Sequence, residues 1–442
     1  NSYELLNQLI RLNAIGNICK AFLKEPDIDA DGNVEKENGL HYFLCSDGRV
    51  HGQTSTTETG RPRAWKPNIL NWPKYVNKSI CKGIGDLLDK LSEAGELPTR
   101  FQKFVGVGDN IPSLRSCVAA PEGWCFVESD YQTAEVRGLA FISGDEELIR
   151  IMTKPDPQFG IIEKDGKTIA MRLSYDENCG ITPENQDPSL LTPHNSTALK
   201  RDSEGNLIHP AADLHWSLAE MMYGIPRERL DKDVHRAAAK VGNFQSMYGA
   251  SDVTLERKIE QDTGKKPEPG TGKRILEALA KRQPVATKFL LDMETSPEEK
   301  GFLMSASGRK RHFATHHAKG IRYDDKWAKK KLNAGMGREA RNFYMQESVA
   351  ATSAKAAKWL LDHFLKHNMQ ARPMVVLYDS VVTLCPLSER EEVSRLHVKY
   401  MATDNTWQYG KNLMHYPIDN EILFRWSTKL TKTEKEFLRN IS

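Results

Sequence analysis

Two kinds of side chain in this sequence could do chemistry on a phosphate: carboxylates beside apolar runs, and cations and aromatics at helical spacing. In 231–250, Arg236, Lys240, Phe244 and Tyr248 follow one another at four-residue intervals, and Gly249 comes next. On an α-helix this row lies along one face and reaches about 18 Å. Its cations could bind phosphates and its rings could stack on a sugar and a base. An amphipathic helix with a solvated basic edge has the same spacing, so the helix alone decides nothing.

Two carboxylates far apart in the sequence accompany short β-prone segments. Asp130 directly follows the run 124–129, and Asp379 lies in a tight junction within 374–384. The first run predicts a buried strand, and the second predicts a buried hairpin with Asp379 at its bend. Two carboxylates that converge can hold two divalent cations about 3.5–4 Å apart. Mg²⁺ is suited to such a site because it prefers oxygen ligands and shares its shell with substrate phosphates. A single acid beside a strand is more often a cap or a surface group, so this prediction depends on the parts occurring together.

The elements that must position these residues are helices and antiparallel hairpins, which together predict an α+β fold. Helical periodicity covers 3–24, 84–94, 134–142, 213–224, 231–250, 252–262, 273–293 and 338–367. Hairpins are predicted at 42–58, around the pair Asp47-Gly48, at 301–313 and at 374–384. The segment 155–210 is interrupted by turn residues every few positions, and we interpret it as an insertion of hairpins and loops.

Composition limits the class of protein. The 442 residues carry a net charge of +3, with basic runs at 309–311 and 329–331 that on their own indicate only a solvated surface. The seven scattered cysteines form no CxxC pair, so we expect a reducing compartment and neither a zinc site nor a disulfide framework. No apolar run approaches membrane-spanning length, and we expect no membrane partner.

Taken together, the motifs resemble the polymerase region of the family A DNA polymerases, the bacterial DNA polymerase I type that is also found in many phages. Residues 130–137 (DYQTAEVR), followed by Leu139-Ala140 and 143–145, are similar to motif A of that family. The row from Arg236 to Gly249 matches motif B, and 378–381 (YDSV) resembles motif C. Supporting matches run in family order between about 45 and 385: Thr59-Gly60-Arg61, Pro67-Asn68, Asp213-Leu214-His215, and the series Arg338, Asn342, Gln346.

The resemblance implies a right-hand polymerase with an antiparallel-sheet palm and helical fingers. The thumb would be largely missing, because the chain begins at Asn1 without a Met and 3–24 resemble the last thumb helix. The implied domains are the end of the thumb and a connector in 1–45, the first part of the palm in 46–212, the fingers and a basic hairpin region in 213–350, and the second part of the palm with the C-terminal segment in 351–442. The segments 74–110 and 155–210 would be insertions.

The resemblance also implies an activity: template-directed addition of dNTPs to a primer 3′ end by two-metal-ion nucleotidyl transfer, with release of pyrophosphate. Two Mg²⁺ ions, for which Mn²⁺ could substitute, would be held by Asp130, Asp379 and the backbone carbonyl of Tyr131. The implied partners are primer-template DNA, dNTPs and a processivity or replisome protein. The implied location is the cytoplasm of a bacterium or of a phage-infected host cell.

By the same resemblance, Arg236, Lys240 and His215 would bind the triphosphate, and Lys240 could also protonate the leaving pyrophosphate. The other nucleotide-binding residues would be Phe244 against the sugar and base, Tyr248 and Gly249 at the template position, and Glu135, which would pair with Tyr248 and exclude a ribose 2′-hydroxyl. Contacts to the primer-template minor groove would come from Arg61, Asn68, Arg338, Asn342 and Gln346.

The sequence departs from the family pattern at several positions. Tyr378 and Ser380 flank Asp379, where motif C usually reads His-Asp-Glu, and Thr133 and Leu70 stand where the family often has Gln. Two alternatives remain. A single-subunit RNA polymerase would need a small residue at Glu135, and an inactive replication accessory protein would bind DNA without extending a primer.

Overall fold

The structure is a computed structural model of the 442-residue chain. It describes residues 27–29, 31, 34–36, 43–46, 50–72, 90–96, 114–153, 159–164, 167–172, 196–198, 200–201, 207–208, 213–225, 229–313 and 325–440. The helix predicted at 3–24 and most of the one predicted at 84–94 lie outside these residues. In the described part of the chain, no helix is both long and apolar enough to cross a bilayer.

The chain divides into two compact units, which we treat separately. The sheet unit comprises Asn1–Gln132, Ala350–Asn405 and Pro417–Ser442, and the helical unit comprises Thr133–Val349 and Thr406–Tyr416. Asp130, Tyr131 and Asp379 belong to the sheet unit, whereas the row from Arg236 to Gly249 belongs to the helical unit.

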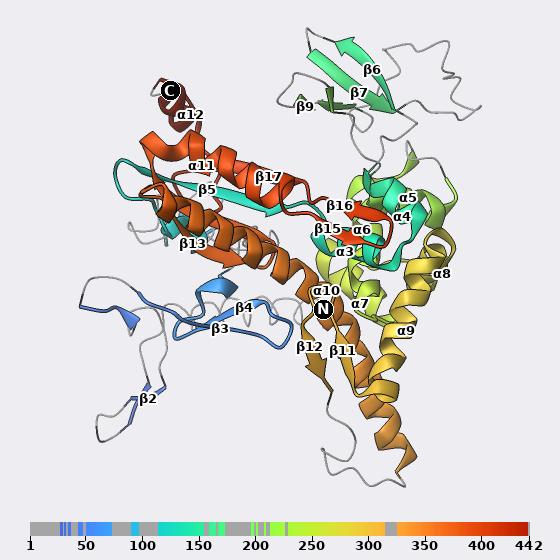
Figure 1. Cartoon of the computed structure of the whole chain (residues 1–442). Helices are drawn as coiled ribbons and strands as arrows, with labels where there is room; N and C mark the ends of the chain where they lie inside the picture. Colours follow the sequence, from blue (N-terminus) through green and yellow to red (C-terminus); the bar gives the residue numbers. More distant parts are fainter. Residues whose placement is uncertain are drawn as a thin grey trace. The chain divides into compact units, whose positions relative to one another are not determined.

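The sheet unit is built on a four-stranded antiparallel sheet in the order β13-β14-β5-β17 (Figure 1). The strands are β5 (Trp124–Tyr131), β13 (Arg372–Leu377), β14 (Ser380–Pro386) and β17 (Ile418–Leu423). Helix α11 (Arg390–His397) packs on β5, β14 and β17. The side chains of Phe126, Val382 and Leu423 form a core on the sheet with Ala64 and Leu70. β5 is an inner strand of the sheet, and the burial of Cys125, Phe126 and Val127 explains the apolar run at its start.

Smaller elements complete the sheet unit: β1 (Asp27–Ile28), β2 (Val34–Lys36), β3 (Gln53–Thr56), β4 (Pro62–Trp65), η2 (Ile69–Asn71), η4 (Leu114–Cys117), η8 (Leu387–Glu389), η9 (Val398–Thr403) and α12 (Lys432–Asn440). An isolated antiparallel bridge joins Leu44 to Val50, on either side of the hairpin predicted around Asp47-Gly48, and that pair itself lies outside the described residues. The next two strands, β3 and β4, pair around a turn at 57–61. The amide of Gly60, whose φ is +78°, donates to the carbonyl of Thr57 and closes that turn.

The helical unit is mainly α-helical (Figure 1). Its helices are α3 (Ala134–Ser143), α4 (Glu146–Thr153), α5 (Leu214–Tyr223), the π-helical η7 (Lys232–Arg236), α6 (Ala237–Met247), α7 (Asp252–Thr263), α8 (Thr271–Arg282), α9 (Pro284–Lys300) and the first part of α10 (Lys326–Lys366). Leu218, Ala239, Leu255 and Ile275 are central in a core that α5, α6, α7 and α8 share.

The strands of the helical unit form short antiparallel sheets. β6 (Phe159–Lys164), β7 (Lys167–Arg172) and β8 (Ser196–Ala198) make a three-stranded sheet, and β9 (Lys200–Arg201) pairs with β10 (Leu207–Ile208). Hairpins in the segment 155–210 are thus confirmed. β11 (Phe302–Met304) with β12 (Lys310–His312) confirms the hairpin predicted at 301–313, and β15 (Trp407–Tyr409) pairs with β16 (Asn412–Met414).

Three predicted helices differ from the structure. The helix predicted over 231–250 begins as a π-helical turn and becomes α-helical at Ala237. The helix predicted over 273–293 is two helices, because Pro284 lacks an amide proton and Gln283 before it has φ −132° and ψ 65°. The long helix begins at Lys326 instead of 338. Asp325 caps it there, since its carboxylate accepts hydrogen bonds from the amides of Trp327 and Ala328.

Candidate functional site

The two acids predicted to work together are neighbours in the sheet unit. β5 and β14 pair with Asp130 opposite Ser380, and β13 pairs with β14 through Leu377 and Ser380, which leaves Tyr378 and Asp379 as the two-residue bend. The amide of Tyr131 donates to the carbonyl of Asp379 at 2.9 Å. Both carboxylates are half-buried. The hairpin with Asp379 at its bend is confirmed, while Asp130 and Tyr131 lie within β5 and not after it.

The bend itself is strained. Tyr378 has a φ of +56°, a left-handed conformation that favours glycine and that typically costs another residue about 1–3 kcal/mol. Neighbouring groups hold it: Ser353 Oγ donates to the carbonyl of Tyr378 at 2.9 Å, and the guanidinium carbon of Arg61 lies 5.1 Å from the centre of its ring. Arg61, predicted to contact DNA, is therefore beside the bend that carries Asp379. Asn68 is exposed before η2.

A third carboxylate stands beside Asp130 and was missed in the sequence. Asp419 of β17 is the cross-strand partner of Asp130, and its Oδ1 accepts a hydrogen bond from Gln132 Nε2 at 2.8 Å. The strand 418–423 (IDNEIL) gave no sequence signal, because its apolar and polar residues do not alternate. In the described residues, no group of three or more His, Cys, Asp or Glu side chains is arranged to hold a metal ion.

The face of the sheet opposite Asp130 carries a buried polar network. Ser129 Oγ contacts Nδ1 of His397 at 2.9 Å and donates to Asn420 Oδ1 at 3.0 Å, and His397 Nε2 lies 2.8 Å from Thr383 Oγ1. Complete burial lowers the pKa of His397 to about 3, so this imidazole is neutral at pH 7. The network therefore joins β5, β14, β17 and α11 on the face of the sheet opposite the side chain of Asp130.

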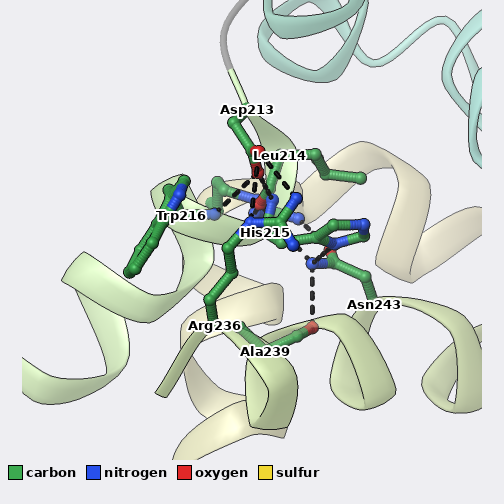
Figure 2. Close-up of polar contacts among 8 residues, drawn as sticks. Asp213, Leu214, His215, Trp216, Arg236, Ala239 and Asn243 are labelled. Carbon is green, nitrogen blue, oxygen red and sulfur yellow. Dashed lines mark hydrogen bonds and ion pairs between the residues drawn. The ribbon is translucent and has the colours of Figure 1, made fainter. Parts of the chain in front are cut away.

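In the helical unit, Asp213 organises the cationic end of the predicted row (Figure 2). Its Oδ1 caps α5 by accepting hydrogen bonds from the amides of His215 and Trp216 at 2.9 and 3.0 Å. Its Oδ2 forms an ion pair with Nη2 of Arg236 at 2.8 Å. Burial alone would raise the pKa of Asp213, but hydrogen bonds and charge from Arg236 outweigh it and leave that pKa below its ordinary value. Asp213 thus fixes Arg236 at the point where η7 joins α6.

His215 lies beside this ion pair but carries no charge at neutral pH. Its pKa is lowered to about 4, chiefly by burial and also by the nearby cations Arg236, Lys240 and Arg282, which together outweigh the opposing effect of Asp213. Its Nδ1 lies 3.2 Å from Asn243 Nδ2. As a neutral imidazole, His215 can offer a phosphate a hydrogen bond and not a positive charge.

Asn243 and Arg282 are structural residues of this cluster that the sequence analysis missed. Arg282 Nη2 donates to Asn243 Oδ1 at 2.7 Å, and its Nη1 donates to the carbonyl of Leu214 at 3.0 Å. Asn243 Nδ2 also donates to the carbonyl of Ala239 at 3.0 Å (Figure 2). These bonds join α5, α6 and α8. The only available signal was the position of Asn243 on the inner face of α6, three residues after Lys240.

The remaining row residues lie along α6 and at its end. Lys240 is exposed, and Phe244 is half-buried with its ring centre 5.7 Å from that of His215. Tyr248 Oη donates a short hydrogen bond to Glu135 Oε2 in the first turn of α3. The structure therefore brings Arg236, His215 and Phe244 together, and it pairs Tyr248 with Glu135.

Gly249, which ends this row, lies close to Arg338 of α10. Its φ is +76°, and a Cβ at this position would lie 3.2 Å from Glu294 Oε1 and 3.4 Å from Arg338 Cγ. Both the backbone conformation and the close approach therefore require glycine. Arg338 is exposed, Asn342 and Gln346 are half-buried, and the three follow one another at four-residue intervals on α10.

The two buried neutral histidines predict a pH dependence of stability. The pKa of an unperturbed His is 6.5, so the unfolded chain binds more protons than the folded chain between that pH and the lowered values of His215 and His397. Stability is fully retained above pH 6.5 and is lost as the pH falls. At pH 5 we expect each histidine to reduce the free energy of unfolding by about 2 kcal/mol.

Urea denaturation at pH 7.5 and pH 5 measures this effect, with His397→Gln as the test variant. Because Gln does not titrate, the variant should lose less stability between the two pH values than the parent does. His415→Gln, at an exposed position, is the matched control. An identical pH-dependent loss in the parent and in His397→Gln would contradict the prediction.

Comparison with known proteins connects this geometry to a family. The model described as DNA polymerase family A matches residues 198–416. The thermostable DNA polymerase I of Thermus aquaticus is 23% identical over 288 residues, which are 65% of this chain and 26% of that protein. DNA polymerase I of Lactococcus lactis subsp. cremoris strain MG1363 is 26% identical over 364 residues, which are 81% of this chain and 29% of that protein. The chain thus matches less than a third of the length of either relative.

A solved structure gives the same result for the fold. The POL domain of Pol1 from M. smegmatis, in complex with DNA primer-template and dNTP, superposes with a TM-score of 0.56 at 16% sequence identity. The match covers 88% of this chain and 50% of that one. The chain therefore has the α+β polymerase fold, and its residues 198–416 match the family A DNA polymerases.

Proposed function

We propose that this chain is a template-directed DNA polymerase that adds dNTPs to the 3′ end of a primer and releases pyrophosphate. The observation that supports this most strongly is the pairing of β5 with β14, which makes Asp130 and the bend residue Asp379 neighbours at one end of a covered antiparallel sheet. The match to the family A DNA polymerases and a structural neighbour that is in complex with DNA primer-template and dNTP support the same reaction. On this proposal, the sheet unit is the palm and the helical unit contains the fingers.

The donor set at this end of the sheet fits a hard divalent cation. Carboxylate oxygens of Asp130 and Asp379, with the backbone carbonyl of Tyr131, are the ligand type that Mg²⁺ prefers, and Mn²⁺ accepts the same ligands. Two such ions would lower the pKa of the primer 3′-hydroxyl and neutralise charge on the leaving phosphate. The role of the chain is to hold the two carboxylates rigidly, which the paired strands and the network behind Ser129 support.

The helical unit would bind the incoming nucleotide. Arg236 and Lys240 would neutralise the triphosphate, while neutral His215 would donate a single hydrogen bond to it. Lys240 is exposed, and its side chain would act as a general acid toward the leaving pyrophosphate as well as a fixed positive charge. Phe244 would pack against the sugar and base, and Tyr248 with Gly249 would border the templating base.

Glu135 supports the choice of DNA over RNA. A carboxylate held by Tyr248 beneath the sugar would leave no room for a 2′-hydroxyl. A single-subunit RNA polymerase requires a small residue at this position, so the structure favours dNTPs as substrates.

The remaining predicted residues would contact the primer-template. Arg61 and Asn68 of the sheet unit, and Arg338, Asn342 and Gln346 of the helical unit, carry donors suited to the minor-groove acceptors that all base pairs share. Contacts of this kind test the shape of a base pair independently of sequence. A separate processivity or replisome protein would supply any further hold on the DNA.

Primer extension tests the proposal directly. The chain is incubated with a labelled primer-template and Mg²⁺, with either dNTPs or rNTPs, and the products are resolved by length. We expect templated extension with dNTPs and at least about 100-fold less with rNTPs. Equal use of rNTPs would assign an RNA polymerase, and DNA binding with no extension in Mg²⁺ or Mn²⁺ would assign an inactive accessory protein.

A further inference from the structure

The first three turns of α10 carry a strongly basic exposed surface. Between Lys326 and Arg338 the helix has four lysines and no acidic residue. The first acid that follows, Glu339, forms an ion pair with Arg311 of β12 at 3.0 Å, so its charge is compensated. This stretch lies outside the residues assigned above to nucleotide or primer-template, except for Arg338.

An exposed aromatic ring lies among these charges. Trp327 is 73% exposed, the highest value among the exposed large apolar side chains of the described residues. The Nζ atom of Lys331 lies 5.4 Å from the centre of the Trp327 ring. An indole this exposed contributes little to the core, and the residues three and four positions after it on the helix are Lys330 and Lys331.

These side chains form a stripe that leads to the proposed DNA contacts. One side of the helix carries four exposed residues at spacings of four, three and four: Trp327, Lys331, Ala334 and Arg338. Lys330 flanks them and is exposed too. At about 1.5 Å per residue, the stripe extends about 17 Å from Trp327 to Arg338. The stripe therefore extends the series Arg338, Asn342, Gln346 by three helical turns toward the N-terminus of α10.

The opposite side of the same turns fixes the helix to the helical unit. Met336, Ala340 and Phe343 pack with Leu303 and Phe313 in one buried cluster, against which Leu332 also lies. The apolar side therefore accounts for the stability of these turns, and the fold does not require the exposed stripe.

We propose that this stripe, together with the flanking Lys330, binds the single-stranded stretch of template DNA. The lysines match the phosphates in charge, and an exposed indole can stack on an unpaired base, because every base offers a ring face. Duplex DNA fits less well since its bases already stack on one another. The inference rests on the proposed function, because it takes the Arg338, Asn342, Gln346 series as the contact to the paired part of the template.

The test measures DNA affinity in the absence of nucleotide, by fluorescence anisotropy of labelled primer-templates. One has a template overhang of a single nucleotide, one has an overhang of ten nucleotides, and one has ten abasic positions. We expect the full chain to bind the ten-nucleotide overhang more tightly than the single-nucleotide one. Trp327→Ala should weaken binding of the ten-nucleotide overhang at least about five-fold and should have no further effect on the abasic overhang.

Two further variants separate stacking from charge. Trp327→Phe keeps a ring and should restore most of the affinity. The double change Lys330→Ala/Lys331→Ala should reduce the slope of log affinity against log salt by about 1.4 on the ten-nucleotide overhang. Lys432→Ala/Lys435→Ala, which removes two exposed lysines from α12, is the matched control and should change neither quantity.

The outcomes distinguish this inference from the proposed function. Equal affinity of the full chain for the long and short overhangs, or equal loss on all three DNAs in Trp327→Ala, would overturn the stripe as a single-strand site. Single-nucleotide extension by the unaltered chain on the short overhang is scored separately. If the unaltered chain does not extend the primer, the proposed polymerase activity is contradicted. The comparison of long and short overhangs depends only on binding affinity and still tests the stripe.

Discussion

Asp379→Asn is expected to reduce the rate of primer extension at least about 1000-fold, because it removes negative charge from one of two carboxylates proposed to hold the metal ions. The substitution preserves the size of the side chain. It also leaves the backbone bond from the Tyr131 amide to the carbonyl of residue 379 available. The sheet should therefore remain intact, and the loss should appear in kcat. Steady-state extension of a primer by one nucleotide, over a range of Mg²⁺ concentrations, measures it.

Ser380→Ala is the matched control because Ser380 is the adjacent residue and is paired opposite Asp130. Its hydroxyl is buried and has no hydrogen-bond partner within the described part of the chain, so its removal should change extension by less than about three-fold. Circular dichroism establishes that both variants are folded. If Ser380→Ala loses as much activity as Asp379→Asn, Ser380 takes part in the reaction. That result would contradict the attribution of the loss in Asp379→Asn to the missing negative charge.

Glu135→Ala is expected to raise the use of rNTPs relative to dNTPs on the order of 100-fold, because it opens the space proposed to exclude the 2′-hydroxyl. The same change removes the acceptor for Tyr248 Oη. Some loss of dNTP incorporation should therefore accompany the gain, since the ring of Tyr248 would be less firmly held. The ratio of kcat/KM for a matched rNTP and dNTP pair is the measurement.

Glu135→Gln separates size from charge in this prediction. Gln is as large as Glu and keeps an oxygen that can accept the hydrogen bond from Tyr248. It should retain most of the preference for dNTPs. If Glu135→Ala and Glu135→Gln change the ratio equally, or if neither changes it, Glu135 does not lie beneath the sugar and the proposed position of the nucleotide is wrong.

The sequence contained the local parts of this site but not their pairing. The bend at Asp379 could be predicted because two continuous β-branched runs flank a tight Tyr-Asp-Ser junction. The register that makes Asp130 the partner of Ser380 and of Asp419 could not, because strand order depends on contacts between segments 250 and 289 residues apart. Asp419 was not identified for this reason, and also because its strand, IDNEIL, does not alternate between apolar and polar residues.

In the helical unit, spacing predicted a helical row but not its internal partners. The ion pair between Asp213 and Arg236 joins residues 23 positions apart, and the bond from Arg282 to Asn243 joins residues 39 positions apart. Burial, which makes His215 neutral, is likewise a tertiary property. The helix break before Pro284 and the cap at Asp325 were local signals that could have been used.

The ion pair between Asp213 and Arg236 has a consequence for any anion that reaches this end of α6. The carboxylate keeps the guanidinium in place before a ligand arrives, and an incoming triphosphate would compete with Asp213 for the same donors. Its association would be an exchange of one anion for another, with a weaker net affinity than a bare arginine would provide and with easier release. An enzyme that must discharge a product after each cycle benefits from such a reversible contact.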